Sequence, residues 1–304
     1  MYKMSGKARI ATEWLMVCSG CHISLLDIHE AIIDVLAKAE IVRSPVLADV
    51  KEFVPADVGI ITGGIRNEHN IHVAKEMRKN CKIIVSLGSC ACFGGTPSLA
   101  NMYTNEELFD KVYKNTMGVD NPLGREPQDD VPPLTEKVAP LSSVIDVDVM
   151  IPGCPPVPEL IAQAVMSLLD GKPLELPNQS VCEPCPRVKK HTKITELKRW
   201  YKSAGEELDP DRCFLEQGYI CLGPVTWGLC DARCPKVGVP CRGCHGPLNP
   251  DRDPGVDAAS FLGTLSSDIP MEQVMEAMGN DPIPILYQHQ FGFTKFNNFK
   301  DAKK

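Results

Sequence analysis

The chain has 304 residues, of which 43% are hydrophobic and 23% are charged, the proportions of a soluble globular protein. Its formal net charge of −7 argues against a nucleic-acid partner, because proteins that bind nucleic acids usually present a basic face. No stretch reaches the roughly 18 apolar residues of a membrane span. The first seven residues contain neither an apolar signal core nor a twin-arginine pair. We therefore expect a cytoplasmic protein with no membrane span.

Strands and helices are expected to alternate over residues 1–176. Strands are predicted at 8–14, 58–62, 82–87 and 144–151, and helices at 22–37, 67–80 and 158–170. The helix at 22–37 carries apolar residues on two sides, so we expect both sides to be covered, one of them by a partner. The alternation predicts an α/β domain of the flavodoxin type, with a parallel sheet and helices on both faces.

Two further segments depart from this alternation. Residues 120–140 are rich in proline and charge and are interpreted as a long surface insertion. From residue 177 the chain has many glycines, prolines and cysteines but few long periodic segments. We expect a boundary near Pro177, so that residues 177–304 form an irregular C-terminal domain that depends on metal clusters as cross-links.

Twelve of the fourteen cysteines fall into three sets of four. The first set is dispersed and consists of Cys18, Cys21, Cys90 and Cys154. Each of its members follows a predicted strand, directly or within a few residues. Because ligands of open α/β sheets bind beyond the carboxyl ends of the strands, we expect these four thiols to meet at one edge.

The other two sets lie in the C-terminal domain. They are Cys182, Cys185, Cys213 and Cys221, and Cys230, Cys234, Cys241 and Cys244. In a reducing compartment such spacings indicate metal or redox chemistry rather than disulfides. Four thiolates hold one iron–sulfur cubane, so three sets predict three clusters. The last set by itself also fits a structural zinc ion, and a zinc-stabilised, non-redox interaction module stays open as an alternative.

The remaining polar features have less specific interpretations. Cys81 begins a strand and is expected to be a buried apolar residue, whereas Cys92 is an alternative ligand because it lies two residues after Cys90. His245 follows Cys244 and is a candidate hydrogen-bond donor to a cluster sulfur. The basic run at 187–202 is interpreted as a solvated helix face, with the docking of an acidic electron-transfer partner as the alternative.

With these residues in hand, the chain resembles the small subunit of a nickel–iron hydrogenase. The resemblance rests on Trp14-Leu15 before Cys18-Ser19-Gly20-Cys21, on Gly88-Ser89-Cys90-Ala91-Cys92-Phe93-Gly94-Gly95, and on Pro152-Gly153-Cys154-Pro155-Pro156. It implies that the first set holds the proximal cluster, the Cys230 set the medial cluster and the Cys182 set the distal cluster. It also implies that nickel and iron lie on the partner large subunit, so that no catalytic residue is expected here.

Two departures refine the resemblance. Many family members have a histidine where this chain has Cys182 and a proline where it has Cys234. The resemblance therefore implies three four-iron (4Fe-4S) clusters that relay electrons from dihydrogen oxidation. The stretches 11–15 and 24–30 look most like the small (G) subunit of the archaeal methyl-viologen-reducing, deazaflavin-nonreducing hydrogenase.

This subtype implies three partners in methanogenesis: the large subunit, a small iron–sulfur (D) subunit and the subunits of heterodisulfide reductase. Two alternatives remain at this point. One is the small subunit of a deazaflavin-reducing hydrogenase. The other is a related subunit of respiratory complexes, against which the eight C-terminal cysteines argue.

Overall fold

The computed structural model describes residues 6–199, 208–279 and 281–295, so the end of the basic run at 200–202 lies outside the described residues. Its N-terminal part is built on a parallel sheet with the strand order β2-β1-β3-β5-β7. The strands are β1 (Ala8–Trp14), β2 (Ala39–Arg43), β3 (Ala56–Thr62), β5 (Cys81–Leu87) and β7 (Val149–Ile151). This is the 2-1-3-4-5 order of flavodoxin-like sheets. The predicted fold class is confirmed.

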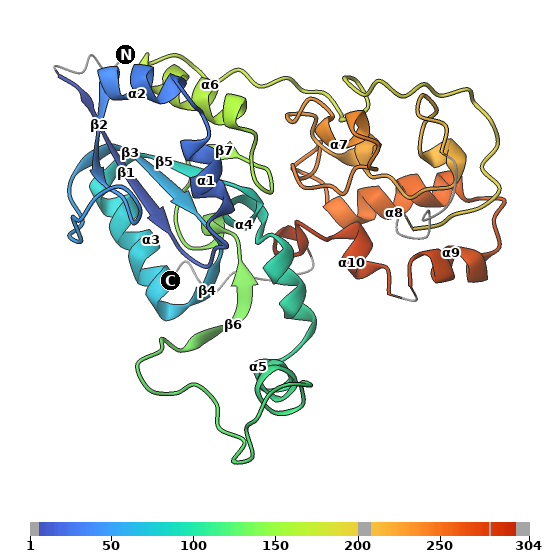
Figure 1. The fold of residues 1–304 in the computed structure, drawn as a ribbon, viewed down its shortest axis with the longest axis horizontal. Coiled ribbons are helices and arrows are strands. Elements are labelled where there is room, and N and C mark those ends of the chain that lie inside the picture. The colour runs from blue at the N-terminus through green and yellow to red at the C-terminus, as the bar shows by residue number, and fades with distance from the viewer. Residues whose placement is uncertain (1–5, 200–207, 280, 296–304) are drawn as a thin grey trace.

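Helices cover both faces of the sheet (Figure 1). On one face, α1 (Gly20–Leu26), α2 (Ala31–Lys38) and α6 (Pro158–Leu169) share a buried core with strand residues such as Ile60. On the other face, α3 (Glu68–Asn80) packs with the neighbouring Ile61. Successive side chains of a strand point to opposite faces, and both are apolar here because both faces are covered.

The prediction of one continuous helix at 22–37 is wrong. The structure has two shorter helices, α1 and α2, separated by residues 27–30. The break occurs at His29, whose φ of +53° is incompatible with a continuing right-handed helix. One apolar side packs into the core through Ile28 and Val35, but Ile23 and Ile33 on the other side are 56% and 67% exposed.

The strand expected at 144–151 is also too long. Pairing with β5 begins only at Val149, after a 3-10 turn η3 (Leu141–Ser143). The side chain of Asp148 accepts the Ile84 N–H at 2.7 Å, and the Asp148 N–H donates to the Ile84 carbonyl at 3.0 Å. The Asp148 carboxylate thus replaces a backbone carbonyl as the hydrogen-bond acceptor just before β7.

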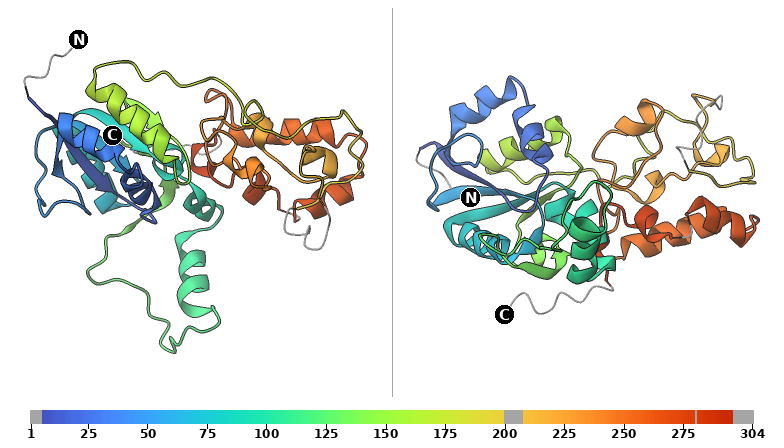
Figure 2. Two further views of the ribbon diagram at one scale, coloured as in Figure 1. Left: turned by 45° about the horizontal axis from the view of Figure 1, so that its top comes forward. Right: turned by 60° about the horizontal axis from the view of Figure 1, so that its bottom comes forward.

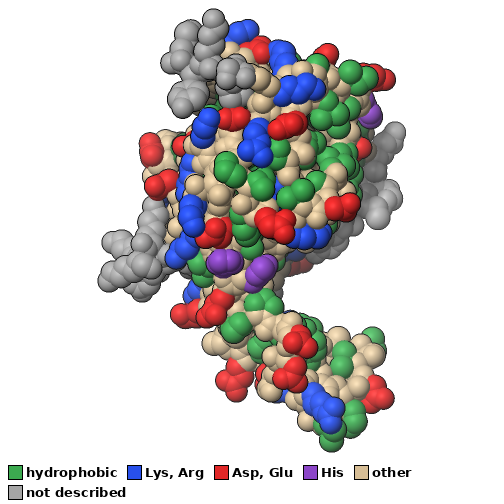
Figure 3. Space-filling model, turned by 90° about the vertical axis from the view of Figure 1, so that its left-hand side faces the viewer, with side chains coloured by type: hydrophobic (Ala, Val, Ile, Leu, Met, Phe, Trp, Pro, Cys, Tyr) green, Lys and Arg blue, Asp and Glu red, His purple; other side chains and the backbone are tan. Residues whose placement is uncertain are grey.

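An insertion within the connection from β5 to β7 projects from the body of the protein (Figures 1 and 3). It contains η1 (Thr96–Met102), α5 (Asn105–Phe109), the π-helical turn η2 (Asp110–Lys114) and β6 (Leu134–Ala139), which pairs antiparallel with β4 (Ile65–Asn67). Arg66 fixes its base by donating to the Thr135 carbonyl at 2.7 Å and to Asn105 Oδ1 at 2.6 Å. The surface insertion predicted at 120–140 is therefore an exposed loop that ends in a strand.

The C-terminal part lies beside the sheet and is reached by an extended segment after α6 (Figure 2). It consists of the 3-10 turns η5 (Leu215–Gln217), η6 (Gly223–Val225) and η7 (Phe291–Phe293), and of the helices α7 (Arg233–Lys236), α8 (Pro254–Leu265), α9 (Met271–Ala277) and α10 (Ile283–Leu286). Helix α8 was not predicted. It packs Ala258 and Leu262 into an apolar cluster of the C-terminal part that is separate from the clusters of the sheet. The boundary at 176/177 stays a prediction.

Helix α4 (Ser89–Phe93) and η1 join the two parts. The rings of Phe93 and Phe293 meet edge to face at 5.3 Å. The Gly292 N–H donates to Ser98 Oγ at 2.8 Å, and Thr96 Oγ1 lies 3.2 Å from His289 Nδ1. Among the residues described, no helix has both the length and the apolar character needed to cross a bilayer.

Candidate iron–sulfur site

The four cysteines of the first set meet at the carboxyl edge of the sheet. Cys18 and Cys21 follow β1, Cys90 follows β5 and Cys154 follows β7. Burial raises the pKa of the Cys21 thiol, and the nearby Cys90, Cys154 and Cys18 thiols raise it further. Burial and the Cys154 and Cys18 thiols raise the pKa of Cys90 to about 12. Four buried thiolates repel one another, so a cationic metal centre among them would stabilise their ionised form.

Glycines leave room around these sulfurs. A Cβ atom on Gly88, where φ is +90°, would lie 2.2 Å from Cys21 Sγ. One on Gly95, where φ is +63°, would lie 2.4 Å from Cys90 Sγ. Both positions require glycine for their backbone angle and for the sulfur beside them. The first set therefore lies in a cradle, a space kept open by Gly88 and Gly95 that larger residues at these positions would fill.

Two buried imidazoles have a nitrogen without a partner in the structure. They are His22 Nε2, next to Cys21, and His245 Nδ1, next to Cys244. Burial lowers the pKa of His22 and lowers that of His245 to about 4, so both rings are neutral at pH 7. Buried polar atoms without partners are uncommon in folded proteins, and the sulfides of a bound cluster would accept their hydrogen bonds. The residues present therefore fit iron–sulfur clusters.

The second set lies in the C-terminal part. Burial raises the pKa of Cys182, Lys189 lowers it, and the thiols of Cys185 and Cys213 raise it again. A Cβ atom on Gly223 would lie 3.3 Å from Cys182 Sγ and 3.6 Å from Cys221 Sγ. The structure thus brings this loosely spaced set together as well.

The third set lies in and around α7, with Cys234 in the helix itself. Burial and the nearby Cys241, Cys230 and Cys234 thiols together raise the pKa of Cys244 to about 12. All fourteen cysteines of the chain are free thiols. In the described ranges, no three or more His, Cys, Asp or Glu side chains are grouped as ligands of a single metal ion.

Backbone amides connect the three sets. The Cys154 amide faces the Cys244 thiol and lowers its pKa, and Ser89 Oγ donates to the Cys244 carbonyl. The Cys241 N–H donates to Cys221 Sγ at 3.3 Å. The third set therefore lies between the first and the second. Ser89 was not singled out from the sequence, although it stands between Gly88 and Cys90.

The two remaining cysteines lie in the core. Cys81 is buried against Gly59, as expected for an apolar residue. Cys92 is buried, and its Sγ lies 3.1 Å from Ser86 Oγ and 3.4 Å from the Ser86 carbonyl. Hydrogen bonds with Ser86 of β5 thus hold the Cys92 thiol in the core.

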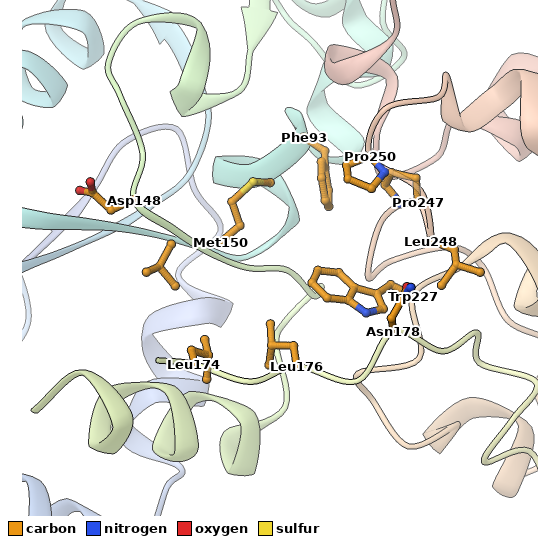
Figure 4. Close-up of a pocket in the computed structure, with 11 residues that line it drawn as sticks. Phe93, Asp148, Met150, Leu174, Leu176, Asn178, Trp227, Pro247, Leu248 and Pro250 are labelled. Atoms are coloured by element: carbon orange, nitrogen blue, oxygen red, sulfur yellow. The ribbon is translucent and has the colours of Figure 1, made fainter. Parts of the chain in front are cut away.

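A groove with a volume of about 570 Å³ lies where the two parts of the chain meet (Figure 4). Phe93, Met150, Leu176 and Trp227 line it, so its walls are mostly apolar. Its one ionisable residue, Asp148, is already paired with Arg78 at 2.5 Å. The groove therefore offers no set of catalytic groups.

Several known proteins are similar to this chain in sequence or in fold. The family model described as NADH ubiquinone oxidoreductase, 20 Kd subunit, matches residues 18–168, which contain the first set. The G subunit of the F420-non-reducing hydrogenase vhu of Methanococcus voltae is 46% identical over 266 residues, covering 87% of this chain and 91% of the relative. The G subunit of the F420-non-reducing hydrogenase of Methanothermobacter thermautotrophicus is 43% identical over 274 residues, covering 89% and 87%.

A solved structure supports the same relationship for the N-terminal part. A chain of an NAD+-reducing NiFe hydrogenase in the H2-reduced state is 35% identical and superposes with a TM-score of 0.54, covering 56% of this chain and 96% of that chain. The long matches above extend the likeness to the C-terminal cysteines. The chain therefore belongs to the small subunits of nickel–iron hydrogenases, among the G subunits of F420-non-reducing hydrogenases.

Proposed function

We propose that this chain relays electrons from a hydrogenase large subunit, where dihydrogen is oxidised, to an acceptor subunit. The relay consists of three four-iron clusters, each of which would accept and release one electron at a time. The proposed ligands are Cys18, Cys21, Cys90 and Cys154 (proximal), Cys230, Cys234, Cys241 and Cys244 (medial), and Cys182, Cys185, Cys213 and Cys221 (distal).

The observation that carries this proposal is the linear order of the three sets. Ser89, next to Cys90 of the proximal set, donates to the Cys244 carbonyl of the medial set. The Cys241 N–H of the medial set donates to Cys221 Sγ of the distal set. A zinc-stabilised module would have no need for three sets joined in this order. The chain's own residues would bind the clusters and fix the separations between them.

The partner at the proximal end is proposed to be the large subunit. Cys18 and Cys154 are exposed in this chain, and the apolar side chains of Trp14, Ile23 and Ile33 are 37%, 56% and 67% exposed on the adjacent elements. Exposed apolar surface beside a cofactor site indicates a protein interface. A covering subunit would also shield the proximal cluster from solvent.

The partners at the distal end are proposed to be a small iron–sulfur (D) subunit and the subunits of heterodisulfide reductase, in the cytoplasm. The support for this step is the resemblance of residues 11–15 and 24–30 to the methyl-viologen-reducing subtype. The identity of the subunits that co-purify under anaerobic conditions tests it. Recovery with a deazaflavin-reducing subunit instead would contradict the subtype.

Metal analysis of the anaerobically purified complex tests the relay itself. We expect about twelve iron atoms and as many sulfides for each copy of this chain. The variants Cys154→Ala, Cys213→Ala and Cys234→Ala are each expected to lose about four iron atoms. A protein that contains zinc in place of iron would refute the relay.

A further inference from the structure

We propose that Ser89 is a positioning residue that holds the proximal and medial cysteine sets at a fixed separation through its hydrogen bonds to the Gly153 and Cys244 carbonyls. This inference rests on the proposed relay and goes beyond it, because Ser89 is not a ligand. It assigns one hydroxyl group to the first transfer step within this chain.

Ser89 contacts three ligand loops at once. It directly precedes Cys90, its N–H donates to the Gly153 carbonyl at 2.8 Å, and its Oγ donates to the Cys244 carbonyl. The residue is 1% exposed, so water does not compete for the hydroxyl group. One residue thereby ties the loops that carry Cys90, Cys154 and Cys244.

The backbone around Ser89 is itself fixed. The Gly88 N–H donates to the Ile151 carbonyl at 2.8 Å, and the Cys92 N–H donates to the Gly88 carbonyl at 3.0 Å. These bonds anchor the start of α4 to β7 and to its own first turn. The Ser89 hydroxyl is consequently presented to Cys244 from a rigid position, not from a mobile loop.

Packing two residues after Cys244 also holds this loop against α4. A Cβ atom on Gly246 would lie only 2.1 Å from the Phe93 ring, so the backbone there touches the aromatic ring. Phe93, Trp227 and Pro247 converge at the same junction (Figure 4). Ser89 at the start of α4 and Phe93 at its end thus hold the Cys244 loop against the same helix.

The bond from the Ser89 hydroxyl to the Cys244 carbonyl has two consequences for an electron relay. Hydrogen bonds donated to the ligands of an iron–sulfur cluster are among the factors that set its potential, and they favour its reduced form by stabilising negative charge. Electron tunnelling also slows steeply as the bonded path between two centres is broken or lengthened. Loss of the Ser89 hydroxyl is therefore expected to lower the medial potential and to slow transfer from the proximal cluster.

Ser98 offers a matched control. It is also a buried serine at the junction, with Oγ donating to the Gly95 carbonyl at 2.6 Å and accepting from the Gly292 N–H at 2.8 Å. It holds the same two parts of the chain together but contacts no cysteine of the three sets through these bonds. Ser98→Ala therefore removes a junction bond without removing the bond to Cys244.

The experiment compares Ser89→Ala, Ser98→Ala and Ser89→Thr in the intact anaerobic complex. Iron content, EPR-monitored redox titration and the rate of medial cluster reduction after a pulse of dihydrogen are measured. We expect Ser89→Ala to keep its iron, lower the medial potential and reduce the rate several-fold. Ser98→Ala should leave potential and rate unchanged, and Ser89→Thr should retain both.

Two results would overturn the inference. One is an unchanged medial potential and rate in Ser89→Ala with full iron content. The other is an equal change in Ser98→Ala, which would assign the effect to the junction as a whole. A wild-type complex without iron–sulfur signals would instead refute the proposed relay, so the two failures are distinguishable.

Discussion

At the scale of single residues, Cys90 and Cys92 show how position decides what a thiol does. Only one residue separates them, but Cys90 lies near Cys18 and Cys154, whereas Cys92 is bonded to Ser86 within the core. We expect Cys90→Ala to lose about four iron atoms per chain and Cys92→Ala to lose none. Iron analysis of the two purified complexes checks this, and equal losses would contradict the assignment.

Gly88 is expected to be indispensable to the proximal site. Gly88→Ala would place a Cβ atom 2.2 Å from Cys21 Sγ, at a φ of +90°. Gly171 provides the control, since its φ is +64° and a Cβ atom added there would have no other atom within 4 Å. Gly171→Ala should cost only about 1 kcal/mol of stability and keep all its iron, whereas Gly88→Ala should lose the proximal EPR signal. Retention of that signal would contradict the cradle.

The cysteine sets were predictable from sequence, but their supporting residues were not. Cysteines are few, and their spacing limits the groupings that chemistry allows. Ser89, in contrast, bonds to a residue 155 positions away, and serine is common in every kind of loop. No local pattern distinguishes such a residue before the two parts of the chain are placed side by side.

At the scale of elements, Asp253 ties helix α8 to the C-terminal segment. As the N-cap it accepts from Gly255 N–H at 3.0 Å and Val256 N–H at 3.1 Å, and it also accepts from Tyr287, Thr294 and Lys295. Asp253→Asn would turn one acceptor oxygen into a donor. We expect it to destabilise the folded chain by about 1–3 kcal/mol, as measured by anaerobic denaturant unfolding, with Ser260→Ala on the same helix as the control. An unchanged midpoint would contradict this role.

The pH dependence of this effect has a definite sign. Burial raises the pKa of Asp253, but hydrogen bonds from Thr294 and Tyr287 outweigh it, so the folded-state pKa is below the ordinary value. A depressed carboxyl pKa stabilises the fold above the unfolded-state pKa of about 3.9. The difference between wild type and Asp253→Asn should be constant from about pH 8 to about pH 5 (a range set by that pKa) and shrink below about pH 4. A difference that grows in acid would contradict it.

Elements with strong local signals were predicted well. β1 has the predicted bounds, and α3 begins one residue after the predicted start of its helix and ends at the predicted residue. The errors occurred where regular backbone pairing is interrupted, by the Asp148 carboxylate before β7 and by the left-handed backbone angle of His29 between α1 and α2. β6 was missed because its partner, β4, is only three residues long and distant in sequence. Such pairings depend on tertiary structure, not on local pattern.

At the scale of the whole molecule, the exposed apolar side of α1 and α2 is expected to bind the large subunit. Ile23→Glu would place a charge in that interface and forfeit about 1.5–3 kcal/mol of apolar burial, so the affinity should fall about tenfold or more. Val256, 46% exposed on α8, provides the control variant Val256→Glu. Co-purification yield and titration of the separated subunits measure the effect. Equal behaviour of the two variants would contradict this surface.

The account as a whole depends on three iron clusters arranged in one line through this chain. Diffraction from crystals of the anaerobic complex, recorded on either side of the iron absorption edge, locates iron directly. The account predicts three compact groups of four iron atoms, with the Cys230 set between the other two. Anomalous signal from zinc at any of these sets, or a set of four cysteines without iron, would contradict it.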